Sequence, residues 1–160
     1  MTDWERLVRE HGPGVYRTAW RVLGHAADAE DVVQDVFLEA QRVRVAVRSW
    51  GALLRRLATF RALDRLRQRK PAVSFDGLNL PSQNGEPADE AIGRELAERL
   101  RQAVADLPER EGAVFCQRYF DDLSYDQIAE NLAISRGAVA SALHKARAKL
   151  EGMLTEVCKE

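Results

Sequence analysis

Basic and polar side chains recur at helical spacing near the end of this 160-residue chain. If residues 135–150 form a helix, Val139 and Leu143 fall on one side of it. The opposite side carries Arg136, Ser141, His144 and Lys145. Such groups donate hydrogen bonds to DNA phosphates, and an arginine can also bind the O6 and N7 atoms of guanine. The pattern therefore indicates a helix that contacts DNA.

The segment before this helix predicts the rest of a helix-turn-helix. Ser124 precedes an apolar-periodic run and Gln127 follows three residues later, which is the spacing of a capping box. The short helix that follows has on one face Ile128, Ala129 and Leu132. Residues 133–135 form a tight turn that ends in a capping serine, and small Ala129 lets the two helices approach closely. The second helix then fits a DNA major groove, unless the pair is an ordinary helical hairpin with a solvated face.

A second concentration of positive charge lies in residues 42–70. This segment holds ten basic residues and a single acidic one, Asp64, although the formal net charge of the whole chain is only −1. A local basic block in a near-neutral chain predicts a polyanionic partner at that place rather than general attraction to nucleic acid. Taken alone, the block is also compatible with a solvated arginine-rich helix.

Several function classes are disfavoured by what the sequence lacks. The three histidines are scattered, and there is no nucleophile–base pair, phosphate-binding glycine loop or metal-ligand spacing, so we expect neither an enzyme nor a cofactor. Cys116 and Cys158 are too few and too far apart for a disulfide framework or a zinc motif. There is no apolar signal-peptide core, and no run approaches the roughly 20 apolar residues of a membrane span. We therefore expect a soluble, cytoplasmic protein without membrane insertion.

A helical period of 3.6 residues dominates the chain and predicts an all-α fold. A first helical region, residues 4–23, is expected to be interrupted around residues 12–14, where glycine and proline alternate. Asp28 is expected to cap the next helix, and a third helix spans residues 49–69. A further helix is expected at residues 89–105, with an apolar stripe of Ile92, Leu96, Leu100 and Val104.

Between these helices, residues 71–87 hold three prolines, two glycines and several small polar residues. This composition is typical of a linker. We therefore expect two small helical domains, residues 1–70 and 89–160, joined by a flexible linker at residues 71–88.

Three stretches, in this order, resemble bacterial sigma factors of the sigma-70 family, in its extracytoplasmic-function (ECF) group. Residues 28–40, DAEDVVQDVFLEA, resemble the family's region 2.2 helix, and residues 47–70 resemble regions 2.3 and 2.4. Residues 107–150 resemble region 4. The resemblance implies a transcription initiation factor that binds core RNA polymerase and directs it to promoter DNA through the minus-10 and minus-35 elements. It also implies an anti-sigma factor as a partner.

The resemblance assigns three sets of contact residues. Core polymerase would bind Asp31, Gln34, Asp35, Phe37, Leu38 and Glu39. The minus-10 element would contact Arg48, Arg55, Arg56, Phe60, Arg61, Arg65 and Arg67. The minus-35 element would contact Ser135, Arg136, Gly137, Ser141, His144, Lys145 and Arg147. No catalytic residue and no metal ligand is expected.

Individual positions leave choices open. Phe60 could stack on an unpaired base or simply pack, whereas Trp50 lies on the apolar stripe and favours a core role. The family's turn usually has glycine where this chain has Ala133. If that residue adopts a left-handed conformation, alanine costs about 1–2 kcal/mol.

Two other function classes stay in view. A helix-turn-helix regulator that binds duplex DNA alone explains the C-terminal motif, but it leaves the arginine-rich and acidic helices without a role. An adaptor that binds another protein through its helices would contact no DNA. For a sigma factor, we also hypothesise that the two tethered domains fold onto each other, or around an inhibitor, until a signal arrives.

Overall fold

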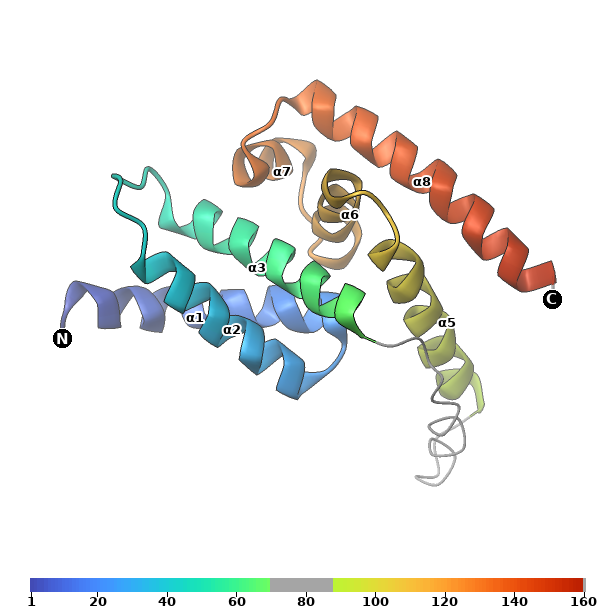
Figure 1. The fold of residues 1–160 in the computed structure, drawn as a ribbon, viewed down its shortest axis with the longest axis horizontal. Coiled ribbons are helices and arrows are strands. Elements are labelled where there is room, and N and C mark those ends of the chain that lie inside the picture. Colours follow the sequence, from blue (N-terminus) through green and yellow to red (C-terminus); the bar gives the residue numbers. More distant parts are fainter. Residues whose placement is uncertain (70–87, 160) are drawn as a thin grey trace.

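The computed structural model describes residues 1–69 and 88–159, with side chains for residues 1–69 and 90–155. The described backbone consists of helices and the turns that join them, which confirms the all-α prediction (Figure 1). The predicted linker falls almost entirely outside the described residues, so the domain boundaries it defines stay a prediction. No described helix is both long enough and apolar enough to cross a membrane.

Three helices make up the N-terminal half. They are α1 (Asp3–Leu23), α2 (Ala26–Gln41) and α3 (Trp50–Gln68). A capping box starts α1, since Thr2 accepts from the backbone of Glu5 and the Glu5 side chain accepts from Thr2. The predicted interruption around residues 12–14 is wrong, because α1 continues through Pro13. A proline inside a helix costs about 3 kcal/mol, and burial of Val15 and Ala19 in the shared core outweighs that loss.

The start of α2 also differs from the prediction. His25, not Asp28, is the N-cap, and its Nδ1 accepts from the Asp28 backbone N–H at 3.3 Å. Gly24 ends α1 in the left-handed conformation, with φ 65°, and the chain turns there before α2 begins at Ala26. The sequence rule failed here because histidine is an uncommon capping residue, whereas aspartate is a preferred one. The predicted third helix is confirmed, with Ser49 as its cap.

The C-terminal half holds α5 (Ala88–Ala105), α6 (Glu109–Phe115), a π-helical turn η2 (Cys116–Phe120), α7 (Tyr125–Leu132) and α8 (Arg136–Lys159). The apolar stripe predicted for α5 is only half right. Leu100 and Val104 pack into the core, but Ile92 and Leu96 are each 55% exposed. Packing therefore uses the C-terminal half of α5, where it meets α3, α6 and α8.

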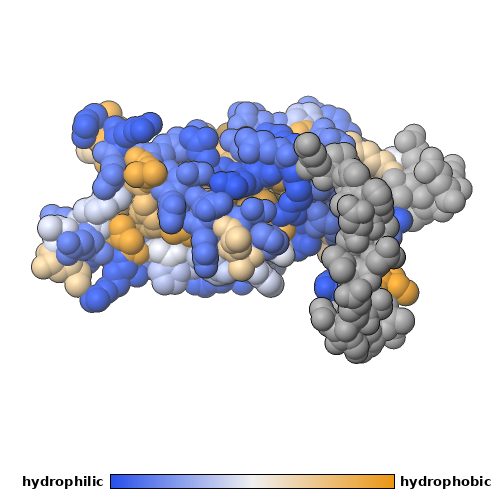
Figure 2. Space-filling view, turned by 60° about the horizontal axis from the view of Figure 1, so that its bottom comes forward, coloured by the Kyte–Doolittle hydropathy of each residue, from blue (hydrophilic) through white to orange (hydrophobic). Residues whose placement is uncertain are grey.

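One core joins the two halves. Helix α3 lies between them, packing on α1 and α2 on one side and on α5, α6 and α7 on the other (Figure 1). Leu54, Leu63 and Leu66 of α3 are fully buried in it. The face shown in Figure 2 is largely hydrophilic, and apolar side chains appear there only in scattered places. In this structure the two sets of predicted DNA-contact residues therefore belong to one packed body.

Candidate nucleic-acid interface

The helix-turn-helix forms as predicted from α7, its turn and α8. In the capping box, Ser124 Oγ accepts from the Gln127 backbone at 3.1 Å and Gln127 Oε1 accepts from the Ser124 backbone at 2.9 Å. Ser135 Oγ accepts from the backbone N–H of Ala138 at 3.0 Å and caps α8. Burial of Val139 in the core fixes how α8 crosses α7. Local capping and core packing thus place the two helices together.

The turn contains a strained alanine. Ala133 lies in the left-handed region, with φ 57° and ψ 46°. Its backbone N–H and that of Ile134 both donate to the Ala129 carbonyl, which closes the end of α7. The conformation that would cost alanine about 1–2 kcal/mol is therefore the one adopted.

The predicted minus-35 residues lie together on the exposed side of α8. All are exposed: Ser135, Arg136, Gly137, Ser141, His144, Lys145 and Arg147. Two of the cations are already engaged within the chain. Arg136 NH1 donates to Asp126 Oδ1 at 2.7 Å. Arg147 Nε donates to the Tyr119 hydroxyl at 2.7 Å, and this hydrogen bond raises the pKa of Arg147.

The predicted minus-10 arginines divide into three groups. Arg48 and Arg56 point to solvent and have no ion-pair partner among the described residues. Two others turn towards α2, where Arg61 binds Glu39 at 2.8 Å and Arg65 lies 3.3 Å from Asp31. The last two, Arg55 and Arg67, turn towards the C-terminal half.

This last group is held by the C-terminal helices. Arg67 donates to the carbonyl oxygens of Ala105 and Leu107, at 3.1 and 3.3 Å. Arg55 lies 3.8 Å from the Asp121 carboxylate. In this arrangement the two arginines hold the halves together and are not free to bind DNA.

Phe60 is half-buried and lines a groove of about 550 Å³ between α3 and the helix-turn-helix. The groove also contains Arg56, Leu57, Leu132 and Ile134. The Phe60 ring packs against the core, and part of it stays accessible. Both stacking on an unpaired base and simple packing are compatible with this position. Trp50 packs against the core, as favoured from the sequence.

The predicted polymerase-binding residues lie on the outer side of α2, with one exception. Asp31, Gln34, Asp35 and Leu38 are exposed, and Glu39 is partly so. Phe37 is buried, and its ring meets that of Trp4 edge to face at 6.0 Å. The expected place of Phe37 on the docking face is therefore corrected: the residue lies on the apolar side of α2, which faces the core.

Ion pairs connect this acidic face to the arginines of α3. Glu39 holds Arg61, and the hydrogen bond between them raises the pKa of the arginine. Arg65 lies within 4.0 Å of Asp28, Asp31 and Asp35. The two surfaces assigned to polymerase and to DNA thus meet along one ion-pair network.

A set of buried polar contacts between the halves was missed from the sequence. We name Thr18, Thr59, Gln117 and Asp121 the polar clasp. Thr18 Oγ1 donates to Asp121 Oδ2 at 2.7 Å, and Gln117 Nε2 donates to Thr59 Oγ1 at 2.9 Å. Arg21 NH1 also donates to Asp121, at 3.1 Å. The sequence signal that could have predicted these contacts is a threonine on the apolar face of α1 and another on that of α3. A buried hydroxyl group requires a hydrogen-bond partner.

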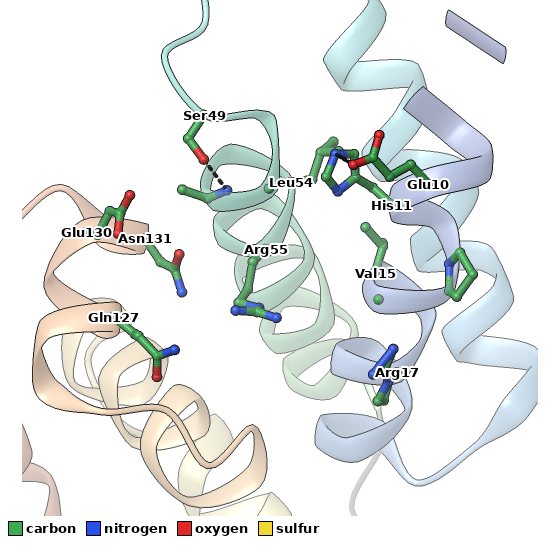
Figure 3. A pocket seen from close by; sticks show the side chains of 14 residues that line it. Glu10, His11, Val15, Arg17, Ser49, Leu54, Arg55, Gln127, Glu130 and Asn131 are labelled. Carbon is green, nitrogen blue, oxygen red and sulfur yellow. Dashed lines mark hydrogen bonds and ion pairs between the residues drawn. The ribbon is translucent and has the colours of Figure 1, made fainter. Parts of the chain in front are cut away.

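The π-helical turn η2 aligns the C-terminal members of the clasp. Its wider turn lets the Asp121 backbone N–H donate to the Cys116 carbonyl, five residues earlier. Gln117 and Asp121 consequently both face α1 and α3. Beside the clasp, a cavity of about 380 Å³ opens between α1, the start of α3 and α7, and Arg55 points into it (Figure 3).

Comparisons with known proteins agree with this geometry. The profile for Sigma-70 region 2 matches residues 7–71, and that for Sigma-70 region 4 matches residues 97–150. The chain is 31% identical to the ECF RNA polymerase sigma factor SigW of Bacillus subtilis, covering 89% of this chain and 84% of SigW.

Two further relatives extend the comparison. The ECF RNA polymerase sigma factor SigE of Mycolicibacterium smegmatis is 30% identical over all of this chain, which spans 65% of the length of SigE. The sigma factor RpoE of Bartonella quintana, crystallised with the anti-sigma factor NepR, has the same fold, with a TM-score of 0.53 at 18% identity. That match covers 97% of this chain and 98% of the other. With both conserved regions matched in order, this chain belongs to the sigma-70 family of RNA polymerase sigma factors, in its ECF group.

Proposed function

We propose that this protein is a transcription initiation factor that binds core RNA polymerase and directs it to promoters with defined minus-10 and minus-35 elements. The observation that supports this most strongly is the coexistence of two DNA-facing elements in one chain that matches both sigma regions. These elements are the exposed basic side of α8 and the arginine-rich α3. In this role the polymerase carries out the chemistry, and the protein selects the promoter. The protein acts in the cytoplasm.

Each element has a task that fits its chemistry. Helix α8 enters the major groove of the minus-35 duplex, with Arg136 near the bases and Lys145 near the phosphates. Arg48, just before α3, and Arg56 of α3 neutralise phosphates of the minus-10 element, so binding weakens with salt. The acidic side of α2 docks on a basic surface of polymerase, which favours correct orientation more than raw affinity.

The packed arrangement is incompatible with simultaneous reading of both elements. Elements named for positions 35 and 10 lie about 25 base pairs apart, on the order of 80 Å of duplex at about 3.4 Å per base pair. Helix α7 packs directly on α3, and packed helices have axes about 8–10 Å apart. The two halves therefore separate before or during promoter binding, which also releases Arg55 and Arg67.

A protein inhibitor fits this requirement. RpoE of Bartonella quintana was crystallised with the anti-sigma factor NepR, and the present chain shares its fold. We propose that an anti-sigma factor holds this protein in a form that cannot bind promoters, by stabilising an inactive arrangement of its two halves.

In vitro transcription with purified core polymerase over a random promoter library tests the proposal. Initiation at sites that share two sequence elements supports it. Arg136→Ala should impair use of the upstream element, while Arg9→Ala, a matched change at an exposed arginine of α1, should not. Binding to duplex DNA without polymerase would instead indicate a helix-turn-helix regulator. Absence of both polymerase binding and promoter-dependent transcription would indicate an adaptor.

A further inference from the structure

An acidic residue stands on the DNA-facing side of the helix-turn-helix, where negative charge repels phosphates. Asp126 belongs to the first turn of α7, and its side chain is 77% exposed. Its Oδ1 accepts from Arg136 NH1 at 2.7 Å, across the turn to the first residue of α8. A carboxylate so placed weakens general attraction to DNA.

The geometry points to Asp126 as a positioning residue that orients Arg136 for base reading, an inference that rests on the proposed function. The ion pair uses NH1 of the guanidinium. It leaves the edge formed by Nε and NH2 without a partner among the described side chains. Two parallel N–H groups on one edge match the O6 and N7 acceptors of guanine.

A second contact restrains the same guanidinium. The Arg136 Cζ atom lies 5.6 Å from the centre of the Tyr125 ring, and Arg118 lies 5.8 Å from it. Arg118 is itself fixed, since its NH1 donates to the Leu123 carbonyl at 3.0 Å. Ring and carboxylate together reduce the freedom that a long arginine side chain loses on binding, which favours a directed contact.

The carboxylate also acts against the competing contact. An arginine that swings onto a phosphate would bring that anion close to Asp126, and the two negative charges repel. Asp126 therefore favours base contact over phosphate contact. Its effects on the two kinds of binding have opposite signs, which separates this role from a purely structural one. An acid in the first turn of α7 could also act only by stabilising the helix, and that role predicts no opposite effects on base contact and phosphate contact.

The experiment uses the full-length protein with core polymerase and promoters that carry each base pair at each minus-35 position. Arg136→Ala identifies the base pair that Arg136 reads, through loss of a preference on the order of tenfold to hundredfold. We expect Asp126→Ala to lose most of the preference at the same base pair. It should also bind non-specific DNA more tightly, with a steeper salt dependence. Asp126→Glu should restore part of the preference.

Glu130→Ala is the matched control, because Glu130 is another exposed acid of α7 and makes no ion pair in the described structure. It removes the same charge without touching Arg136. In an Arg136→Ala background, Asp126→Ala should change base preference no further.

The inference is overturned if Asp126→Ala and Glu130→Ala give the same base profile, or if the preference lost lies at a base pair that Arg136 does not read. Failure of the wild-type protein to initiate at any promoter would instead overturn the proposed function.

Discussion

The polar clasp makes a quantitative prediction about how firmly the two halves are held together. Asp121 is buried, with its side chain 6% exposed, and it receives hydrogen bonds from Thr18 and Arg21. In Asp121→Asn, a carbonyl oxygen in the place of Oδ2 still accepts from Thr18, but the new amide N–H group takes the place of Oδ1 and faces the donor of Arg21, and Arg55 loses its charged partner. Both arginines are partly exposed, at 41% and 39%, so water compensates for part of the loss.

The expected cost follows from these contacts. A hydrogen bond to a charged group contributes about 1.5–3 kcal/mol, and partial hydration lowers the net loss to about 1–3 kcal/mol. If the halves separate without unfolding, this loss shifts the balance from closed to open by about 5- to 150-fold. The variant should therefore populate an open form that the wild type rarely visits.

Small-angle scattering and amide hydrogen exchange measure this change. The radius of gyration should rise from about 15 Å, the value for a compact chain of this length, and the amides of η2 should exchange faster. Asp122→Asn is the matched control, since Asp122 is the adjacent, exposed acid and asparagine tolerates its φ of 53°. The reasoning is refuted if both variants scatter and exchange like the wild type.

Three further outcomes are expected. Ala133→Gly relieves the left-handed alanine, and after the greater flexibility of glycine in the unfolded chain is subtracted, the protein should gain about 0.5–1 kcal/mol in urea denaturation. Unchanged or lower stability would contradict the strain assigned to the turn. Asp35→Lys should impair assembly with core polymerase in a pull-down while circular dichroism stays native, and unimpaired assembly would remove Asp35 from the docking face. Burial raises the pKa of the Cys116 thiol, so in a Cys158→Ser background it should react with iodoacetamide only on unfolding. Because the folded pKa is the higher one, stability should fall as pH rises above about 8.5, the unfolded value, and Cys116→Ala should remove that fall. Rapid labelling of the native protein would show that the thiol is accessible.

Prediction from the sequence succeeded at the two local caps of the helix-turn-helix. The capping box at Ser124 and the cap at Ser135 depend on residues three positions away, and both form as predicted. The prediction failed at Pro13, where local rules favour a break but burial of Val15 and Ala19 in the shared core outweighs it. Phe37 is the opposite case, because its helical spacing with Val32, Val36 and Ala40 favours burial, and only the family resemblance placed it on the docking face.

The directions of the arginines could not be predicted in this way. Sequence gives the number of cations on α3, but their partners belong to other helices, such as Glu39 for Arg61 and the Leu107 carbonyl for Arg67. Asp121 reads locally as the end of a helix. Its buried partner, Thr18, lies 103 residues earlier in the chain, beyond the reach of any periodic pattern.

The polar character of the clasp has a consequence for the proposed separation of the two halves. Each hydrogen bond broken on opening, such as that between Gln117 and Thr59, is replaced by bonds to water, so its net cost is only about 0.5–1.5 kcal/mol. An apolar contact in the same place would expose its full surface, at about 25 cal/mol per Å², and would leave a patch prone to association. Paired polar groups also exclude other packings, because a shifted register would bury them without partners. The clasp can therefore specify one closed arrangement while adding little to the free energy that separation of the shared apolar core already costs.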